Sequence, residues 1–170
     1  YFLNGGVEEK FTGEDRILIP SPRVKTYDMK PEMSAFEVSN HVIENIKKKK
    51  YDLIITNFAN PDMVGHTGNI EATVKAIEAV DECIGKIFKQ CKKNGYSLIL
   101  TSDHGNAENM FDEKKNLACT THSLNLVPFT ICEKINYSIK TGKLADIAPT
   151  VLKLLGLEIP TVMKGKPLIK

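Results

Sequence analysis

The pattern that most constrains the fold is a long helical repeat between two short apolar runs. Residues 70–93 carry apolar side chains at steps of three and four, the spacing of one face of an α-helix: Ile70, Val74, Ile77, Val80, Ile84, Ile87 and Cys91. Residues 53–55 and 97–100 are short apolar runs, which is typical of buried parallel strands. A strand, a helix and a second strand in this order predict an α/β fold, with a mostly parallel sheet flanked by helices.

Further segments extend this unit on both sides. Ser34 and Glu37 match a capping box, which predicts that a helix begins after Ser34. Residues 126–132 are expected to form a third strand, in which Pro128 indicates an edge or an irregular end. Asp146 is the expected N-cap of a last helix.

The overall composition excludes several classes of protein. With 170 residues, the chain is long enough to bury a sizeable core in one domain. A net charge of +2, with a basic run only at residues 47–50, does not predict a nucleic-acid surface. No apolar run is long enough to span a membrane. Four cysteines without a CxxC spacing fit a reducing, cytoplasmic location.

Polar side chains follow both predicted strands of the central unit. Asp62 and His66 lie after the first run, and Asp103 and His104 come directly after the second. Because the carboxyl ends of parallel strands meet at one edge of a sheet, these four side chains are expected to converge. His122 lies in the next loop, which is too long to be a mere connector.

These side chains are suited to a divalent metal ion. Three His and two Asp, without a Cys, favour Mn²⁺, Zn²⁺, Co²⁺ or Fe²⁺ and weaken the case for a structural zinc. An isolated Asp–His pair is more often a helix cap or a buried hydrogen bond, and Asp62 with His66 alone would be weak evidence. Their placement after consecutive strands, together with His122, favours metal binding over those alternatives.

Residues 57–68 resemble the signature of the cofactor-independent (2,3-bisphosphoglycerate-independent) phosphoglycerate mutase family. The resemblance covers essentially the whole chain through shorter motifs at residues 2–6, 13–16, 27–34, 101–108, 121–123 and 146–150. The last of these is shared with much of the alkaline phosphatase superfamily and is less specific. The motif at residues 57–68 is narrow.

The resemblance implies an alkaline-phosphatase-like domain with two divalent metal ions. By position in the motifs, Asp62, His66 and His122 would hold the first metal. Asp103 and His104 would help to hold the second. Mn²⁺ is the expected ion, although Mg²⁺, Co²⁺ or Zn²⁺ also fit some of these ligands.

Three polar residues beside the second ligand pair have other expected roles. Asn106 and Glu108 are candidates for side chains that orient the ligands, with a role as surface residues as the alternative. Ser102 precedes the ligand pair at a strand end and is expected to be structural.

The family interconverts 3-phosphoglycerate and 2-phosphoglycerate in glycolysis and gluconeogenesis, through a phosphoserine intermediate. The resemblance therefore implies this isomerase activity at a two-metal site, with no requirement for 2,3-bisphosphoglycerate. Two metals suit phosphoryl transfer because they lower the pKa of the nucleophile and stabilise charge on the attacking and leaving oxygens. The substrate would be phosphoglycerate, with no nucleic-acid or membrane partner. The intact protein is expected to be a cytoplasmic monomer.

In the family, the nucleophilic Ser and an Asp of the second metal site precede the segment present here. The inserted transferase domain and the Arg and Lys residues that grip the substrate also lie outside it. Residues 1–170 are therefore expected to be the C-terminal segment of a phosphatase-like metal-binding domain, with no nucleophile of its own and no activity alone.

Two other functions stay open. One is a different metallo-hydrolase or phosphomutase of the alkaline phosphatase superfamily, similar to a phosphopentomutase or a sulfatase, although residues 60–68 speak against it. The other is a non-catalytic, metal-stabilised module, which only the missing nucleophile favours.

Overall fold

A computed structural model describes residues 4–113, 116–132 and 137–170 of the chain. Its helical segments are η2 (Tyr27–Met29), α1 (Ala35–Lys48), α2 (Asn60–Gly65), α3 (Ile70–Asn94), η3 (Leu144–Asp146) and α4 (Ile147–Leu154). Its strands are β1 (Leu98–Thr101), β2 (Phe111–Asp112), β3 (Leu117–Ala118) and β4 (Phe129–Cys132). None of the helices in these ranges is both long and apolar enough to cross a lipid bilayer.

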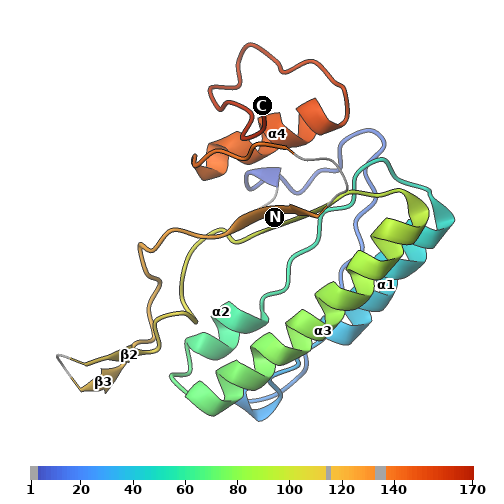
Figure 1. Ribbon diagram of the computed structural model, residues 1–170. Coiled ribbons are helices and arrows are strands. Elements are labelled where there is room, and N and C mark those ends of the chain that lie inside the picture. The colour runs from blue at the N-terminus through green and yellow to red at the C-terminus, as the bar shows by residue number, and fades with distance from the viewer. Residues whose placement is uncertain (1–3, 114–115, 133–136) are drawn as a thin grey trace.

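The long helix predicted from the apolar repeat is confirmed as α3. It begins after Asn69, whose side-chain oxygen accepts the backbone N–H of Ala72 at 3.1 Å. It ends at Gly95, whose φ of 80° lies in the left-handed region that favours glycine. Figure 1 shows α1 running alongside α3, and the main core lies between these two helices.

The core between α1 and α3 consists of two apolar clusters and continues under α2 as a third. The clusters are Ala35 with Val80 and Cys83, Ile46 with Ile87 and Cys91, and Met33 with Val64, Ala72 and Ala76. Small side chains dominate the third cluster, so the α2 and α3 backbones can approach closely there. This close approach holds α2 in place, and α2 carries part of the candidate site.

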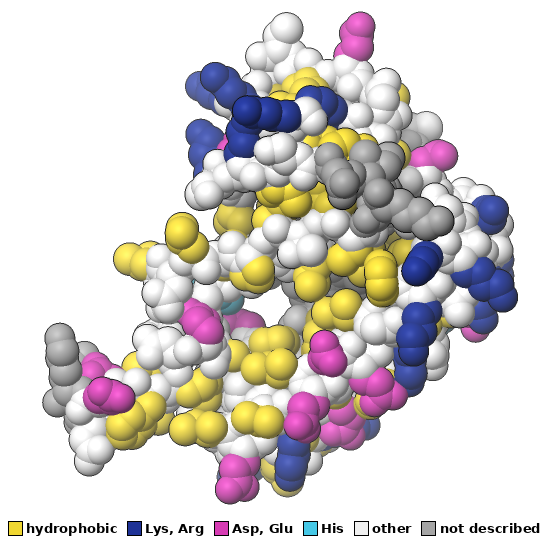
Figure 2. All heavy atoms as spheres, in the orientation of Figure 1, with side chains coloured by type: hydrophobic (Ala, Val, Ile, Leu, Met, Phe, Trp, Pro, Cys, Tyr) yellow, Lys and Arg dark blue, Asp and Glu magenta, His cyan; other side chains and the backbone are white. Residues whose placement is uncertain are grey.

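The apolar stripe predicted for α3 is only partly buried. Val80, Ile87 and Cys91 are buried, but Ile70, Val74 and Ile77 are exposed. Figure 2 shows hydrophobic side chains gathered on the outer face over α2 and α3. The large residues at the start of the repeat stay exposed because the first turns of α3 place the small residues Ala72 and Ala76 against α2 instead. The spacing of apolar residues in the sequence does not by itself show which of two apolar faces of a helix is buried.

The α/β class is confirmed, but the predicted mostly parallel sheet is not found among the described residues. β1 pairs with β4 in an antiparallel ladder, with Leu98 opposite Cys132 and Thr101 opposite Phe129. Residues 53–56 have no strand partner among the described residues. Ile54 packs on the cluster around Ile46, as Leu98 of β1 also does.

The ends of the outer elements differ in detail from the sequence prediction. The capping box at Ser34 is not formed, because the Ser34 hydroxyl donates to the carbonyl of Pro20 at 2.7 Å. The Asp146 carboxylate does cap a helical segment, but its bonds go to η3 and to the C-terminal tail. It accepts the backbone N–H groups of Lys143 at 2.9 Å and Lys166 at 2.8 Å. The tail is thereby fixed against α4, as Figure 1 shows.

Candidate metal centre

Two of the predicted ligands lie on one short helix. The middle of the segment from Asn57 to Gly68 forms α2, with Pro61 in the first turn where its missing N–H costs nothing. Asp62 lies in the first turn and His66 caps the C-terminus, one helical turn later. Side chains four residues apart on a helix lie on the same face. Accordingly, Oδ1 of Asp62 lies 3.1 Å from Nε2 of His66.

His122 completes a group of three donors. Its Nε2 lies 3.1 Å from Oδ1 of Asp62 and 3.2 Å from Nε2 of His66. Ligand–metal bonds of about 2.0–2.2 Å place neighbouring donors of one ion at about 3–3.5 Å from each other. The three donor atoms therefore have the separations that a single divalent ion would require, and we call Asp62, His66 and His122 the triad.

The orientation of His66 also suits a metal. Its Nδ1 lies 2.6 Å from the carbonyl oxygen of Thr120. A carbonyl can only accept, so Nδ1 carries the proton and donates it. The lone pair of the neutral ring is then on Nε2, which faces Asp62 and His122. This arrangement is the usual way in which proteins orient a metal-ligating imidazole.

His104 lies beside the triad, whereas Asp103 is largely in solvent. The His104 ring stacks on the His122 ring, with centroids 3.7 Å apart and an interplanar angle of 17°. Its Nε2 lies 3.9 Å from Oδ1 of Asp62 and 3.7 Å from Oδ2 of Asp103. The Asp103 side chain is 74% exposed. Within the described ranges, only the triad forms a group of three candidate ligands. Asp103 and His104 place two further potential donor side chains beside the triad.

Both serines near these ligands are engaged in structural hydrogen bonds. The Ser102 hydroxyl donates to the carbonyl of His104 at 2.7 Å, which supports its expected structural role. The Ser123 hydroxyl donates to the carboxylate of Glu108. In this arrangement each hydroxyl donates to a group of the segments that carry the predicted ligands.

Asn106 connects the segment after β1 to the triad. Its side-chain nitrogen donates to Oδ1 of Asp62 at 2.8 Å, and the residue is buried. Gly65 makes room for it, because a Cβ at position 65 would lie 2.6 Å from Oδ1 of Asn106. Asn106 thus contacts a ligand directly. Thr120 and Ser123 also touch this network, but no spacing pattern in the sequence marked them.

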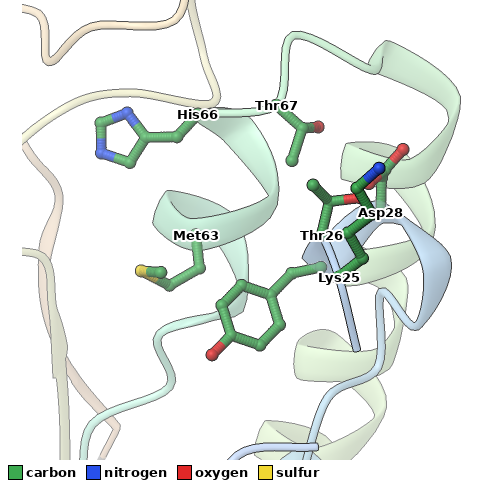
Figure 3. A pocket seen from close by; sticks show the side chains of 7 residues that line it. Lys25, Thr26, Asp28, Met63, His66 and Thr67 are labelled. Atoms are coloured by element: carbon green, nitrogen blue, oxygen red, sulfur yellow. The ribbon is translucent and has the colours of Figure 1, made fainter. Parts of the chain in front are cut away.

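A separate cavity lies on the other side of α2. It has a volume of about 400 Å³ and is lined by Lys25, Thr26, Tyr27, Asp28, Met63, His66 and Thr67. Figure 3 shows the His66 ring directed away from the side chains of Thr26 and Asp28. The donor face of His66 therefore belongs to the triad, and the cavity is only its neighbour. Figure 2 shows acidic and histidine side chains at the edge of an opening between the helices and the β1–β4 strands.

Comparisons with known proteins show the family of the chain. The family description of the metalloenzyme superfamily matches residues 1–159. The chain is 53% identical to the 2,3-bisphosphoglycerate-independent phosphoglycerate mutase of Ehrlichia ruminantium, over 99% of this chain and 34% of the relative. It is 55% identical to the protein of that name from Gracilaria tenuistipitata var. liui, over 100% of this chain and 34% of the relative.

A solved structure is similar over the full chain. Leishmania mexicana phosphoglycerate mutase, crystallised at low cobalt concentration, superposes with a TM-score of 0.90 at 32% identity. The match covers 100% of this chain and 34% of that one. The chain thus spans about a third of the length of the curated relatives it matches. At this identity and TM-score, the fold is that of the corresponding part of a phosphoglycerate mutase.

Proposed function

Because the chain belongs to the metalloenzyme superfamily, whose description matches residues 1–159, we propose that the protein interconverts 3-phosphoglycerate and 2-phosphoglycerate without 2,3-bisphosphoglycerate. The observation that carries the proposal is the triad, with its three donor atoms 3.1–3.2 Å apart. The names and identities of the relatives supply the substrate and the reaction.

In this proposal, Asp62, His66 and His122 hold one divalent metal ion. The bound metals would stabilise charge on the transferred phosphoryl group and lower the pKa of its nucleophile. Thr120 keeps the proton of His66 on Nδ1 and so leaves Nε2 free for the ion. Asn106 fixes Oδ1 of Asp62 from the opposite side.

Asp103 and His104 are proposed to contribute to the second metal. His104 stacks on His122, so the two rings are held together and the two metals would be neighbours. Nδ1 of His104 is buried and forms no hydrogen bond within the described part of the chain. A buried polar atom of this kind needs a partner, which a metal or a group from another part of the protein would supply.

The nucleophile is proposed to lie outside residues 1–170. The hydroxyls of Ser102 and Ser123 are both bonded to structural acceptors, which supports this assignment. The inserted transferase domain and the side chains that grip the substrate are assigned to the remaining length of the relatives. Residues 1–170 would then be the C-terminal segment of the phosphatase-like domain.

Mn²⁺ is the metal we propose for the native enzyme. Two imidazoles and one carboxylate form a mixed nitrogen and oxygen site, which suits Mn²⁺, Co²⁺ or Zn²⁺. Cobalt in the crystals of the Leishmania mexicana enzyme supports a site with this tolerance. We further propose a cytoplasmic monomer with no nucleic-acid or membrane partner.

The test is a mutase assay on the full-length protein with 3-phosphoglycerate, Mn²⁺ and no 2,3-bisphosphoglycerate. Turnover is expected with metal, and chelation should abolish it. A matched assay of residues 1–170 alone should give no turnover. Activity that survives both chelation and the His122→Ala change would contradict the proposal.

A further inference from the structure

The carboxylate of Glu108 joins two segments that are separate in sequence. Its Oε2 accepts the backbone N–H of Asn106 at 2.6 Å. Its Oε1 accepts the hydroxyl of Ser123 and the side-chain N–H of Asn125, the latter at 3.0 Å. One side chain therefore binds both the segment after β1 and the segment around residue 123.

Each of these segments positions one member of the triad. Asn106 donates its side-chain N–H to Oδ1 of Asp62 at 2.8 Å, and Ser123 directly follows His122. Two backbone bonds also join these segments: the Ser123 N–H donates to the Gly105 carbonyl at 2.8 Å, and the Cys119 N–H donates to the Met110 carbonyl at 2.9 Å. Around His122, residues 119–128 form no helix or strand. The Glu108 bonds thus add side-chain contacts to these two backbone bonds.

Two observations separate this arrangement from an ordinary polar surface. Hydrogen bonds to the hydroxyl of Ser123, to Asn125 and to the backbone of Asn106 lower the pKa of the Glu108 carboxyl, so the acceptor is charged and its bonds are the stronger kind. A Cβ at Gly105 would collide with both the Glu108 carboxylate and the Ser123 hydroxyl. The backbone at residue 105 therefore leaves the space that this contact needs.

We propose that Glu108 is a positioning residue of the metal centre, whose carboxylate holds His122 at its distance from Asp62 and His66. This inference rests on the proposed metal site, because it concerns the free energy needed to order the His122 segment of that site. With Glu108, the His122 segment is ordered before the metal binds. Without Glu108, the metal must order the segment, and that cost lowers the affinity.

The first experiment measures Mn²⁺ and Co²⁺ affinity by calorimetry on the full-length protein and on its Glu108→Gln variant. Glutamine has the same size but no charge, and one oxygen where Glu108 has two. Affinity is expected to fall about 10- to 100-fold, the usual effect of losing a group that supports a metal ligand. The absorption spectrum of bound Co²⁺ should change as well, because the position of His122 relaxes. The matched control is Glu113→Gln, an exposed glutamate in the same segment for which no ion pair or hydrogen bond is found among the described residues.

A second experiment separates positioning from general stability. In a His122→Ala background the segment carries no ligand, so Glu108→Gln should no longer weaken metal binding. Ser123→Ala, which leaves every ligand in place, should reproduce part of the loss and should not add fully to Glu108→Gln. Thermal unfolding of the metal-free variants checks that the fold is intact.

Three results would overturn the inference. Metal affinity of Glu108→Gln within twofold of the parent protein would remove the positioning role while leaving the proposed function untouched. An equal loss with and without His122 would reduce Glu108 to a general stabiliser. A parent protein that binds neither ion would overturn the proposed metal site, and the role of Glu108 with it.

Discussion

The Nε2 atoms of His66 and His122 face each other at 3.2 Å, although the two residues are 56 positions apart in the chain. Two neutral imidazoles gain nothing from facing lone pairs, so this contact needs a cation between them or a proton on one ring. Oδ1 of Asp62, 3.1 Å from both atoms, adds a negative charge at the same point. A metal ion bound by Asp62, His66 and His122 would satisfy all three donor atoms.

Removal of either histidine should weaken metal binding strongly. His66→Ala and His122→Ala each delete one of three donors, and we expect Mn²⁺ affinity to fall by more than the 10- to 100-fold typical of lost supporting groups. Calorimetric titration of the full-length protein provides the measurement. His41→Ala on α1, outside the triad, is the control and should bind metal as the parent does. Equal affinity for all three variants would exclude the triad as the metal site.

Gly65→Ala is expected to destabilise the protein by about 1–3 kcal/mol, because the added methyl overpacks against the Asn106 side chain. The displaced Asn106 would also release Asp62. Gly85 on α3 provides the opposite case, since a Cβ there would meet nothing within 4 Å. Gly85→Ala should stabilise the protein by about 0.5–1 kcal/mol, because alanine suits a helix interior better than glycine. Denaturant unfolding measures the change in unfolding free energy of each variant. Changes of the same sign in both variants would contradict the contact at Gly65.

The N-terminal segment should loosen at low pH through Glu14. The hydrogen bond from the Arg16 guanidinium, helped by the Phe11 backbone N–H and by Asn4, lowers the pKa of Glu14 from 4.5 to about 2. A carboxyl whose pKa is depressed in the fold stabilises it above the unfolded-state pKa, and the contribution is lost as pH falls from 4.5 through 2.

The protection of the amides around Glu14, measured as exchange relative to the intrinsic rate at each pH, should therefore decrease as the pH falls through this window. A Glu14→Gln variant should show the faster exchange already at neutral pH, with little further change on acidification. Protection in this segment that is independent of pH in the parent protein would show that the Arg16 contact does not form in solution.

Thr150 should be critical for the C-terminal tail. It is fully buried, and its hydroxyl donates to the Asp146 carbonyl at 2.6 Å while accepting the Leu168 backbone N–H at 2.8 Å. Thr150→Val keeps the shape but leaves the backbone N–H of Leu168 without its partner, which should cost about 1–3 kcal/mol of unfolding free energy. Thermal unfolding measures the loss. Thr161→Val, at an exposed position in the same tail, should change stability little.

The elements that the sequence predicted well are those whose contacts are local. The helix α3 follows from apolar spacing, with Asn69 at its start and Gly95 at its end. The pairing of Asp62 with His66 is also local, because the two side chains are four residues apart on α2. Their spacing alone brings both donors to one face.

The elements that were predicted wrongly depend on contacts across the chain. Residues 53–56 have the composition of a buried strand, but Ile54 packs on the α1–α3 core and the ladder is antiparallel. Which face of α3 is buried depends on the element that packs against it. At α2, Ala72 and Ala76 are buried, whereas Val74 is exposed. No local pattern contains this information.

The sequence by itself determined the donor types, the Asp62–His66 pair and the proximity of Asp103 to His104, because these depend on neighbours within one turn. Only the tertiary structure decided that His122 joins the triad and that His104 stacks on it. The position of His122 is set by bonds from Thr120, Ser123 and Glu108 to residues far away in the chain. Such bonds form only after the chain has folded, because their partners come from separate loops that the core first has to bring together.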